Sequence, residues 1–408
     1  MRFPLYPSEA VAPRDRADAL QALASHHGRA RALAETLTEA QLRRQYHPEL
    51  SPVGWHLGHC ALMEHHWVEE RVGEAAPDSA LHALYFPELS PKDERATRLP
   101  ARDALMAWTT GVHERTLSRF ADPPGWLNAH PLMADDYLLH FLEQHFAQHH
   151  ETLLYCLTAI TASEPASAPG PDGDGTPYSA PTGPDAIHLA PGRYRVGADH
   201  VRAYDNERPS HTVQLEGAWL ARRPVTNAQW LAFMAAGGYG DDTCWSNEGA
   251  AWRERNRVTY PWNWHPLEGG RFISSGPLGY EPLQPDAPVS GISHYEAEAF
   301  ARWAGARLPH EFEWEAADRQ GLLTDTGRVW EWCSNPLAPY PGFRPFPYDG
   351  YSMPWFDGEH PVLRGGCRFT HPGIKRSSFR NFFQRHVRHQ QAGLRLAWDT
   401  PPSEVKTP

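Results

Sequence analysis

The sequence of 408 residues lacks the features that mark several classes of protein. No run of eighteen apolar residues occurs, and the N-terminal segment MRFPLYPSEAVAPRDR has no apolar core of a signal peptide, so we expect neither membrane insertion nor export. Cysteines are few, odd in number and without CxxC or other metal-finger spacing, which favours a reduced, cytoplasmic setting over a disulfide framework. The five are Cys60, Cys156, Cys244, Cys333 and Cys367.

A basic excess is also lacking. The formal net charge is −11, which argues against a general nucleic-acid binder, because neutralising phosphates requires positive charge. Charge is uneven, however: residues 361–398 contain eight Lys or Arg and no Asp or Glu. We expect these cations to pair with acids elsewhere in the domain, and a local anion-binding surface is the alternative.

The length predicts two domains, because one hydrophobic core seldom organises so many residues. The stretch ASEPASAPGPDGDGTPYSAPTGPD, which begins at Ala162, is rich in Pro, Gly, Ser and Ala and almost free of large apolar residues, as expected of a linker. We therefore predict a first domain at 1–161, a linker at 162–186 and a second domain at 187–400.

The two predicted domains differ in hydrophobic pattern. Before the linker, apolar residues recur at three- and four-residue intervals in four segments, 14–37, 53–72, 101–120 and 135–161, which predicts a small helical bundle. After the linker, short apolar runs alternate with Gly, Pro, Asn and Asp, which is typical of an irregular α+β domain with long loops. Within it, 294–320 is more helical, and Arg307-Leu308-Pro309 should divide it into two helices.

Two of the helical segments carry a split set of histidines. His145 and His149 are four residues apart and project from one helix face, while His59 ends the motif Trp55-His56-Leu57-Gly58-His59 about ninety residues earlier. Bundles build metal sites from side chains on facing helices, and three imidazoles leave part of a metal ion open for chemistry. The i,i+4 pair alone leaves a surface or hydrogen-bonded role open.

Motifs in both halves carry a resemblance to known families. The N-terminal Ser51-Pro52-x-x-Trp55-His56-Leu57-Gly58-His59 and His145-x-x-Gln148-His149-x-Glu151 resemble a DinB-like bundle. The second half resembles the C-type-lectin-like fold of the formylglycine-generating enzymes (sulfatase-modifying factors). Both motif sets in this order resemble the iron-dependent sulfoxide synthases of ergothioneine biosynthesis and the related selenoneine synthases. The C-terminal motifs are Tyr204-Asp205-Asn206-Glu207-Arg208-Pro209, Pro224-Val225-Thr226-Asn227, Arg307-Leu308-Pro309-x-Glu311-x-Glu313-Trp314-Glu315, Val329-Trp330-Glu331-Trp332 and Leu363-Arg364-Gly365-Gly366.

The resemblance implies a reaction and a set of site residues. It implies an enzyme in which Fe(II) and O2 couple a sulfur or selenium donor to the imidazole carbon of hercynine, the betaine of histidine. His59, His145 and His149 match the three iron ligands, and Gln148 and Asn381 match positions that hold hercynine. The loop with Tyr348 and Tyr351 supplies a proton donor, for which we favour Tyr348. The aromatic Phe382 and Phe383 can contact the trimethylammonium group.

Two departures from the family bear on the donor. Where enzymes that use γ-glutamylcysteine have an acid and an arginine, this chain has Phe383 and Val387, so the resemblance implies an apolar wall suited to a selenosugar or thiosugar. Formylglycine-generating enzymes bind copper through a late cysteine pair, and residues 376–380, Arg-Ser-Ser-Phe-Arg, contain none, which argues against that activity.

Alternative functions remain open at the level of sequence. Within the same class, a sulfoxide synthase using cysteine or γ-glutamylcysteine is the nearest alternative. Others are a zinc-dependent thiol transferase, because DinB-like bundles also hold a divalent metal through three histidines, and a non-catalytic binding module. In a chain with 24 histidines we expect those beside the proposed ligands to be surface or hydrogen-bonded residues and not ligands: His56, His65, His66, His140 and His150. Glu151 is expected to be an outer hydrogen-bond partner or a surface carboxylate.

Overall fold

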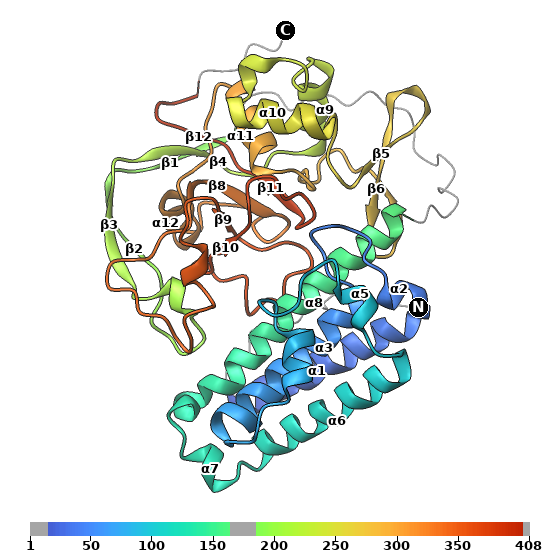
Figure 1. Ribbon diagram of the computed structural model, residues 1–408. Coiled ribbons are helices and arrows are strands. Elements are labelled where there is room, and N and C mark those ends of the chain that lie inside the picture. Colours follow the sequence, from blue (N-terminus) through green and yellow to red (C-terminus); the bar gives the residue numbers. More distant parts are fainter. Residues whose placement is uncertain (1–14, 164–184, 403–408) are drawn as a thin grey trace. The chain divides into compact units, whose positions relative to one another are not determined.

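A computed structural model describes residues 15–163 and 185–402 (Figure 1). The chain forms two compact units, each of which is described by itself. The first contains the N-terminal helices together with two short stretches from later in the chain, 276–279 and 369–374. The second contains the remaining C-terminal residues. The mixed architecture confirms the predicted fold class, a helical bundle followed by an α+β domain with small sheets.

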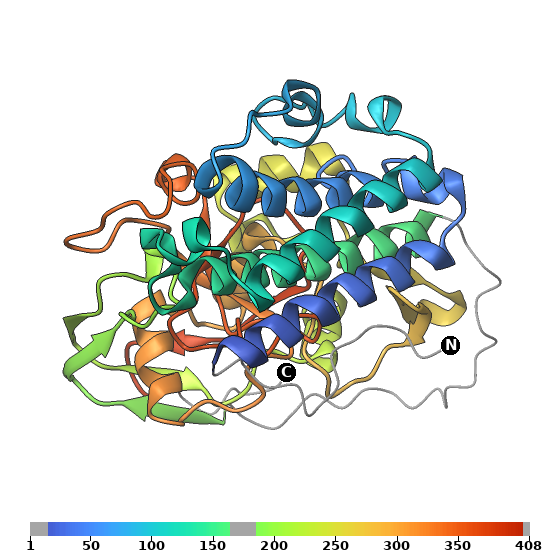
Figure 2. The same ribbon diagram turned by 90° about the horizontal axis from the view of Figure 1, so that it is seen from below.

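Four long helices make the bundle of the first unit: α1 (Arg16–Thr36), α3 (Val53–His65), α6 (Arg102–Ala121) and α8 (Tyr137–Ser163). Helix α1 packs on α6 and α8, and α3 packs on the same two helices, so the four run alongside one another (Figure 2). The four predicted helical segments are therefore confirmed. Helix α8 begins at Tyr137 because Asp135 and Asp136 both have left-handed backbone conformations, with φ of 51° and 57°.

The helix that begins at Val53 changes character before it ends. From His66 to Val72 it continues as a π-helix, whereas the sequence predicted one uniform helix over 53–72. Periodicity of apolar residues does not register this change, because a π-turn adds only one residue to the repeat. Shorter elements also join the long helices: α2 (Glu39–Arg43), α4 (Ser79–Tyr85), α5 (Arg95–Arg98), α7 (Gly125–Asn128) and a 3-10 turn at Pro131–Asp136.

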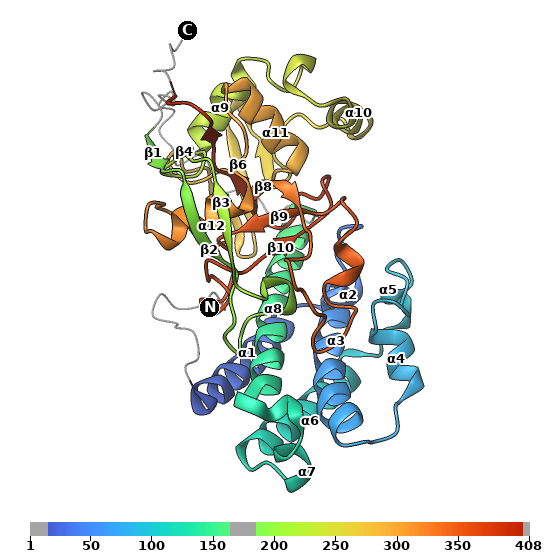
Figure 3. The same ribbon diagram turned by 90° about the vertical axis from the view of Figure 1, so that its left-hand side faces the viewer.

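The second unit is built on small sheets joined by long loops. The largest has the strand order β10-β9-β8-β11, and Figure 3 shows β8, β9 and β10 side by side; the others have the orders β1-β4-β12, β2-β3 and β5-β6-β7. The strands are β1 (Ala186–Leu189), β2 (Gly192–Val196), β3 (His211–Leu215), β4 (Ala218–Ala221), β5 (Trp264–Pro266), β6 (Phe272–Gly276), β7 (Gly279–Pro282), β8 (Trp330–Pro336), β9 (Pro361–Arg364), β10 (Asn381–Phe382), β11 (Ala392–Leu394) and β12 (Ala397–Trp398).

Helices of the second unit begin at side-chain caps. The helices are α9 (Asn227–Ala235), α10 (Asn247–Asn256), α11 (His294–Trp303) and α12 (Glu311–Arg319). Ser293 and Glu296 form a capping box at the start of α11, which satisfies two backbone donors that the helix itself leaves unpaired. The separate helices α11 and α12 confirm the predicted division at Arg307-Leu308-Pro309.

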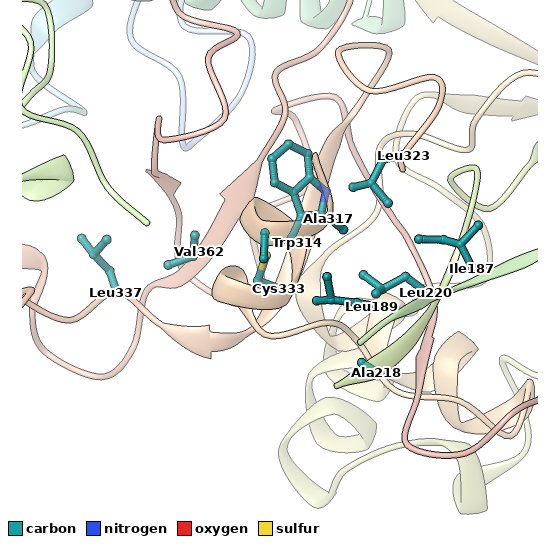
Figure 4. Packing of buried hydrophobic residues seen from close by; sticks show 11 residues of the cluster. Ile187, Leu189, Ala218, Leu220, Trp314, Ala317, Leu323, Cys333, Leu337 and Val362 are labelled. Atoms are coloured by element: carbon teal, nitrogen blue, oxygen red, sulfur yellow. The ribbon is translucent and has the colours of Figure 1, made fainter. Parts of the chain in front are cut away.

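A hydrophobic cluster connects α12 to the neighbouring sheets. Trp314 is 1% exposed and packs with Leu189, Leu220 and Val362, which come from three different strands (Figure 4). Because these side chains approach from β1, β4 and β9, burial of the one helix face holds two sheets together. This packing holds in place strands after which several predicted site residues lie in the sequence.

The basic stretch at 361–398 is neutralised within the second unit. Six of its eight cations pair with a glutamate of that unit, so the expected pairing is confirmed. Arg364 and Arg380 both bind Glu311, at 2.6 and 2.7 Å, and although burial raises the pKa of Glu311, their guanidinium groups hold it at about 2. The other four pairs are Arg368–Glu281, Arg376–Glu207, Arg388–Glu296 and Arg395–Glu331.

The predicted linker lies largely outside the described residues. Helix α8 ends at Ser163 and β1 begins at Ala186, and of the segment 162–186 the residues 164–184 are not described. Among the described residues, no helix combines the length and the apolar character needed to cross a membrane.

Candidate metal centre

Three histidines converge inside the first unit. Helix α3 carries His59, and α8 carries His145 and His149 on successive turns of one face. Nε2 of His59 and Nε2 of His145 are 3.3 Å apart, and the rings of His149 and His59 have centroids 4.6 Å apart. One nitrogen from each residue lies within 4.8 Å of the other two. The structure thus brings the three predicted ligands together.

The spacing of these nitrogens fits a metal ion. Two nitrogens that each lie about 2.1 Å from one ion are about 3.0 Å apart at a right angle and about 3.4 Å apart at the tetrahedral angle. The 3.3 Å between His59 and His145 falls in that range. Metal ligation requires that both nitrogens lack a proton; neither can then donate to the other, and a shared cation satisfies both lone pairs.

The outer nitrogen of His59 is fixed by the backbone. Its Nδ1–H donates to the carbonyl oxygen of Tyr85 at 2.8 Å, which leaves the lone pair of Nε2 for a metal. The ring of Trp55 stacks on that of His59 at 4.9 Å. Gly58 makes the approach possible, because a Cβ at this position would lie 2.1 Å from the Tyr85 ring. The glycine of the Trp-His-Leu-Gly-His motif is therefore required by packing.

His56, which we expected not to be a ligand, holds His149 in place. The Nδ1 atoms of the two residues are 3.2 Å apart. For His149 to present Nε2 to a metal, its Nδ1 must carry the proton and donate to Nδ1 of His56. The proton of His56 is then on Nε2, a buried atom for which no hydrogen-bond partner is found among the described residues. Sequence reasoning missed this role, although the residue lies in the quoted motif.

Burial keeps all these imidazoles neutral. Desolvation lowers the pKa of His59 to about 4 and that of His56 to about 3, and it places the pKa of His145 and of His149 well below the usual value. The neighbouring imidazoles lower the last two further. Because only neutral imidazole binds a metal, the group is ready to act as a ligand set at neutral pH.

The other predicted residue of the first unit is Gln148, which precedes His149 on α8 and is partly exposed. Glu151, one turn further, is buried at 5% exposure and accepts a hydrogen bond from the Tyr155 hydroxyl. Its carboxylate is therefore an internal hydrogen-bond partner within α8.

The predicted tyrosines lie in the second unit, in a loop that follows β8. Tyr348 is 39% exposed, and Tyr351 stacks on Tyr204 with ring centroids 4.4 Å apart. Stacking fixes the position of Tyr351, whereas the exposure of Tyr348 leaves its ring open to solvent.

The remaining predicted substrate residues follow or form β10 in the second unit. Asn381 turns its Oδ1 toward the backbone N–H of Phe382, at 3.0 Å, and Phe382 packs against the hydrophobic cluster of Trp314. Phe383 meets His389 edge-on at 5.9 Å, and Val387 is 5% exposed. These residues are brought together with each other but belong to a different unit from the histidines.

Comparison with known proteins places both halves of the chain in described families. Residues 22–153 match the DinB superfamily, and residues 174–326 and 319–400 match the sulfatase-modifying factor enzyme 1-like domain.

Full-length relatives are found as well. The chain is 34% identical over 435 residues to the hercynine oxygenase of Mycobacterium tuberculosis, covering 92% of this chain and 98% of the relative. It is 31% identical over 427 residues to the hercynine oxygenase of Mycolicibacterium smegmatis, covering 88% and 94%. A shorter match, 26% identical over 228 residues, covers 48% of this chain and 27% of ergothioneine biosynthesis protein 1 of Schizosaccharomyces pombe.

Proposed function

The chain belongs to the family of the hercynine oxygenases, and we propose that it is an Fe(II)- and O2-dependent enzyme that joins selenium or sulfur to the imidazole of hercynine. One observation supports the proposal above others. Three neutral imidazoles from two helices, one buried and two partly buried, bring one nitrogen each within 4.8 Å of the others, in a chain that matches hercynine oxygenases over nearly their whole length.

The metal ligands proposed are His59, His145 and His149. Three neutral nitrogen donors leave the charge of the ion uncancelled and leave coordination positions for other ligands. Iron, when bound, supplies the one-electron chemistry that O2 requires. The chain itself keeps the ligands oriented, through the Tyr85 carbonyl on His59 and through His56 on His149.

The reaction proposed balances with one O2 per turnover. The imidazole carbon loses its hydrogen, the selenol or thiol loses its hydrogen, and a bond forms between carbon and the chalcogen. One oxygen atom goes to the chalcogen as selenoxide or sulfoxide, and the other leaves as water with the two hydrogens. O2 accepts four electrons, two from forming the new bond and two from oxidising the chalcogen.

Side chains outside the histidine triad are proposed to bind the substrate and to supply a proton. Tyr348 is proposed as the proton donor, because a phenol with an unperturbed pKa near 10 remains protonated at neutral pH. Gln148 and Asn381 are proposed to hold hercynine through their amides. Phe382 and Phe383 are proposed to face its trimethylammonium group.

The donor we propose is a selenosugar. Phe383 and Val387 carry no charge, and the arginines beside Val387 are directed elsewhere: Arg385 lies 3.3 Å from Nδ1 of His294, and Arg388 lies 2.9 Å from Glu296. A zwitterionic peptide placed against such a wall leaves charges unpaired, which costs several kcal/mol, whereas a neutral sugar does not.

An aerobic assay with Fe(II) and hercynine tests the proposal. Selenosugar, thiosugar, cysteine and γ-glutamylcysteine are offered in parallel, products are identified by mass, and O2 consumption is recorded. We expect the selenosugar product to dominate. Use of γ-glutamylcysteine with no turnover of selenosugar would return the protein to the ergothioneine branch. Zinc retention with O2-independent thiol transfer would overturn the oxygenase proposal, and absence of any turnover would favour a binding module.

A further inference from the structure

A second group with metal-binding chemistry lies in the first unit, outside the histidine triad. It comprises His66 and Glu70 from the π-helix and His82 from α4, and ligand atoms of the three lie within 4.8 Å of one another. The Glu70 carboxylate is 2.7 Å from Nδ1 of His66 and 2.8 Å from Nε2 of His82. None of these residues contributes to the proposed reaction.

The two rings are held so that their nitrogens converge. They meet at 76°, with centroids 5.5 Å apart, and both pack edge-on against Phe86. Rings at such an angle can direct their lone pairs at one point, in contrast to stacked rings, whose lone pairs run parallel. Phe86 fixes the rings from one side and excludes water there.

Access and charge also suit a cation. The Glu70 side chain is 2% exposed, whereas His66 and His82 keep 19% and 17% of their side-chain surfaces exposed. The carboxylate is thus sheltered while water reaches the rings. Nearby, Nε2 of His65 lies 3.6 Å from the other carboxylate oxygen, so three imidazoles surround one acid. In this structure Nδ1 of His66 and Nε2 of His82 donate hydrogen bonds to Glu70. A metal ion would take the place of these two protons, with each ring protonated on its other nitrogen and the ligand atoms about 3.0–3.4 Å apart.

The local backbone is a second, independent observation. The segment His66–Val72 is a π-helix, an arrangement that proteins seldom use and that is found frequently at functional sites. The departure from α-helical geometry begins at His66 and includes Glu70. A change from α-helical to π-helical hydrogen bonding alters the directions in which side chains point. Such a change at His66 and Glu70 is expected if these side chains must face a common ligand.

Two similar groups of the same unit do not fit a metal as well. In the group of His27, Glu64 and His113, the two rings stack at 3.8 Å with an angle of 5°, so their lone pairs cannot converge. In the group of His26, Glu143 and His371, Nδ1 of His371 already accepts the backbone N–H of Gly373 at 3.2 Å.

We propose that His66, Glu70 and His82 form a second metal site, which binds Zn2+ through two imidazoles and one carboxylate with water completing the coordination. Two histidines and a glutamate are an established ligand set for zinc, with distances of about 2.0 to 2.2 Å. The carboxylate contributes the negative charge that the histidine triad lacks. None of its residues is proposed to bind hercynine or iron, and the site revises our expectation that His66 binds no metal.

Zinc stoichiometry tests the site without reference to catalysis. Metal-free full-length protein is titrated with Zn2+ against a competing chelator, which suppresses weak binding by other histidines. We expect about two equivalents for the wild type and about one for H145A/H149A, which loses the triad. The variant H66A/H82A should also bind about one. His188 belongs to none of these groups, so H188A is the matched control and should keep both equivalents.

The outcomes separate cleanly. Full binding by H66A/H82A or no binding by H145A/H149A would each overturn the second site. A single equivalent in the wild type would overturn it if H66A/H82A keeps that equivalent. Glu70→Gln preserves the shape of the side chain and serves if the double variant does not fold. In the H145A/H149A background, Zn2+ should raise the melting temperature, because a ligand of the native state stabilises it. Adding Glu70→Gln should abolish that rise, and an undiminished rise would refute the site.

Discussion

Replacing His56 with alanine tests how the triad is oriented. The change removes the group that accepts the Nδ1–H of His149 at 3.2 Å and leaves that N–H without its partner. The ring of His149 can then rotate or exchange tautomers, and either change withdraws Nε2 from the metal. We expect H56A to fold and to bind metal more weakly than the wild type.

The size of the effect follows from the burial of the pair. His56 is 6% exposed, and a buried donor left unpaired costs about 1–3 kcal/mol. Loss of an outer hydrogen-bond partner of a ligating histidine typically lowers metal affinity about 10–100-fold, which corresponds to about 1.4–2.8 kcal/mol. Since the two ranges agree, we expect the dissociation constant for Fe(II) to rise by about one to two orders of magnitude.

The assay is anaerobic competition for Fe(II) with a chromophoric chelator. It is performed in a Glu70→Gln background, so that the proposed zinc site does not contribute. His56→Asn is the rescue variant, because an amide Oδ1 lies near the position of the imidazole Nδ1 and can accept the same hydrogen bond. His150→Ala is the matched control: this histidine is buried and adjacent to His149 on α8, and it is outside the triad.

Three results would refute this reasoning. An Fe(II) affinity of H56A within about twofold of the wild type would mean that His149 needs no partner on Nδ1. Equal weakening in H56A and H56N would mean that the volume of the ring matters and its acceptor does not. Weakening in H150A as large as in H56A would point to general loosening of α8.

Three further outcomes are expected. Gly58→Ala should destabilise the fold by about 1–3 kcal/mol through overpacking, and so lower the melting temperature. It should also weaken metal binding, because the added Cβ would displace Tyr85 from His59. Calorimetry showing no loss of stability would contradict the packing argument. Tyr348→Phe should keep iron and hercynine binding but lose coupling, and a silent Tyr348→Phe beside a damaging Tyr351→Phe would exchange their roles. The metal-free protein should lose stability as pH falls from about 6.5 toward 4, because His59 takes up a proton in the unfolded chain but stays neutral in the folded one. The contribution of His59 is about 1.4 kcal/mol per pH unit. A melting temperature that does not change over that pH range would contradict this prediction.

The triad was predictable from sequence because part of it is local. Spacing of four residues on a helix places His145 and His149 on one face whatever the remainder of the fold does. His59 needed the resemblance, since no spacing rule relates residues on different helices. The break between α11 and α12 was predictable for a similar reason, because a proline at 309 acts on its own backbone.

Interactions between helices were not predictable in the same way. The role of His56 comes from its contact with His149, and that contact depends on how α3 packs against α8. His66, Glu70 and His82 come close together because of the π-helix that carries the first two and the position of α4, which carries the third. Composition could suggest that the arginines of 361–398 find acids, yet it could not say that Arg364 and Arg380 share Glu311.

The triad and the group around Glu70 differ in charge, so the two proposed sites would favour different metals. The triad offers three neutral nitrogens, so an ion bound there keeps its full charge and attracts anionic or oxygen ligands. The second group includes a buried carboxylate, which cancels part of the charge of the ion and makes it a weaker Lewis acid. Iron, as proposed for the first position, would be redox-active and open to substrate, while the zinc proposed for the second would hold α4 against the π-helix. Because α4 ends at Tyr85, whose carbonyl orients His59, the zinc site would steady the same ligand that the reaction depends on.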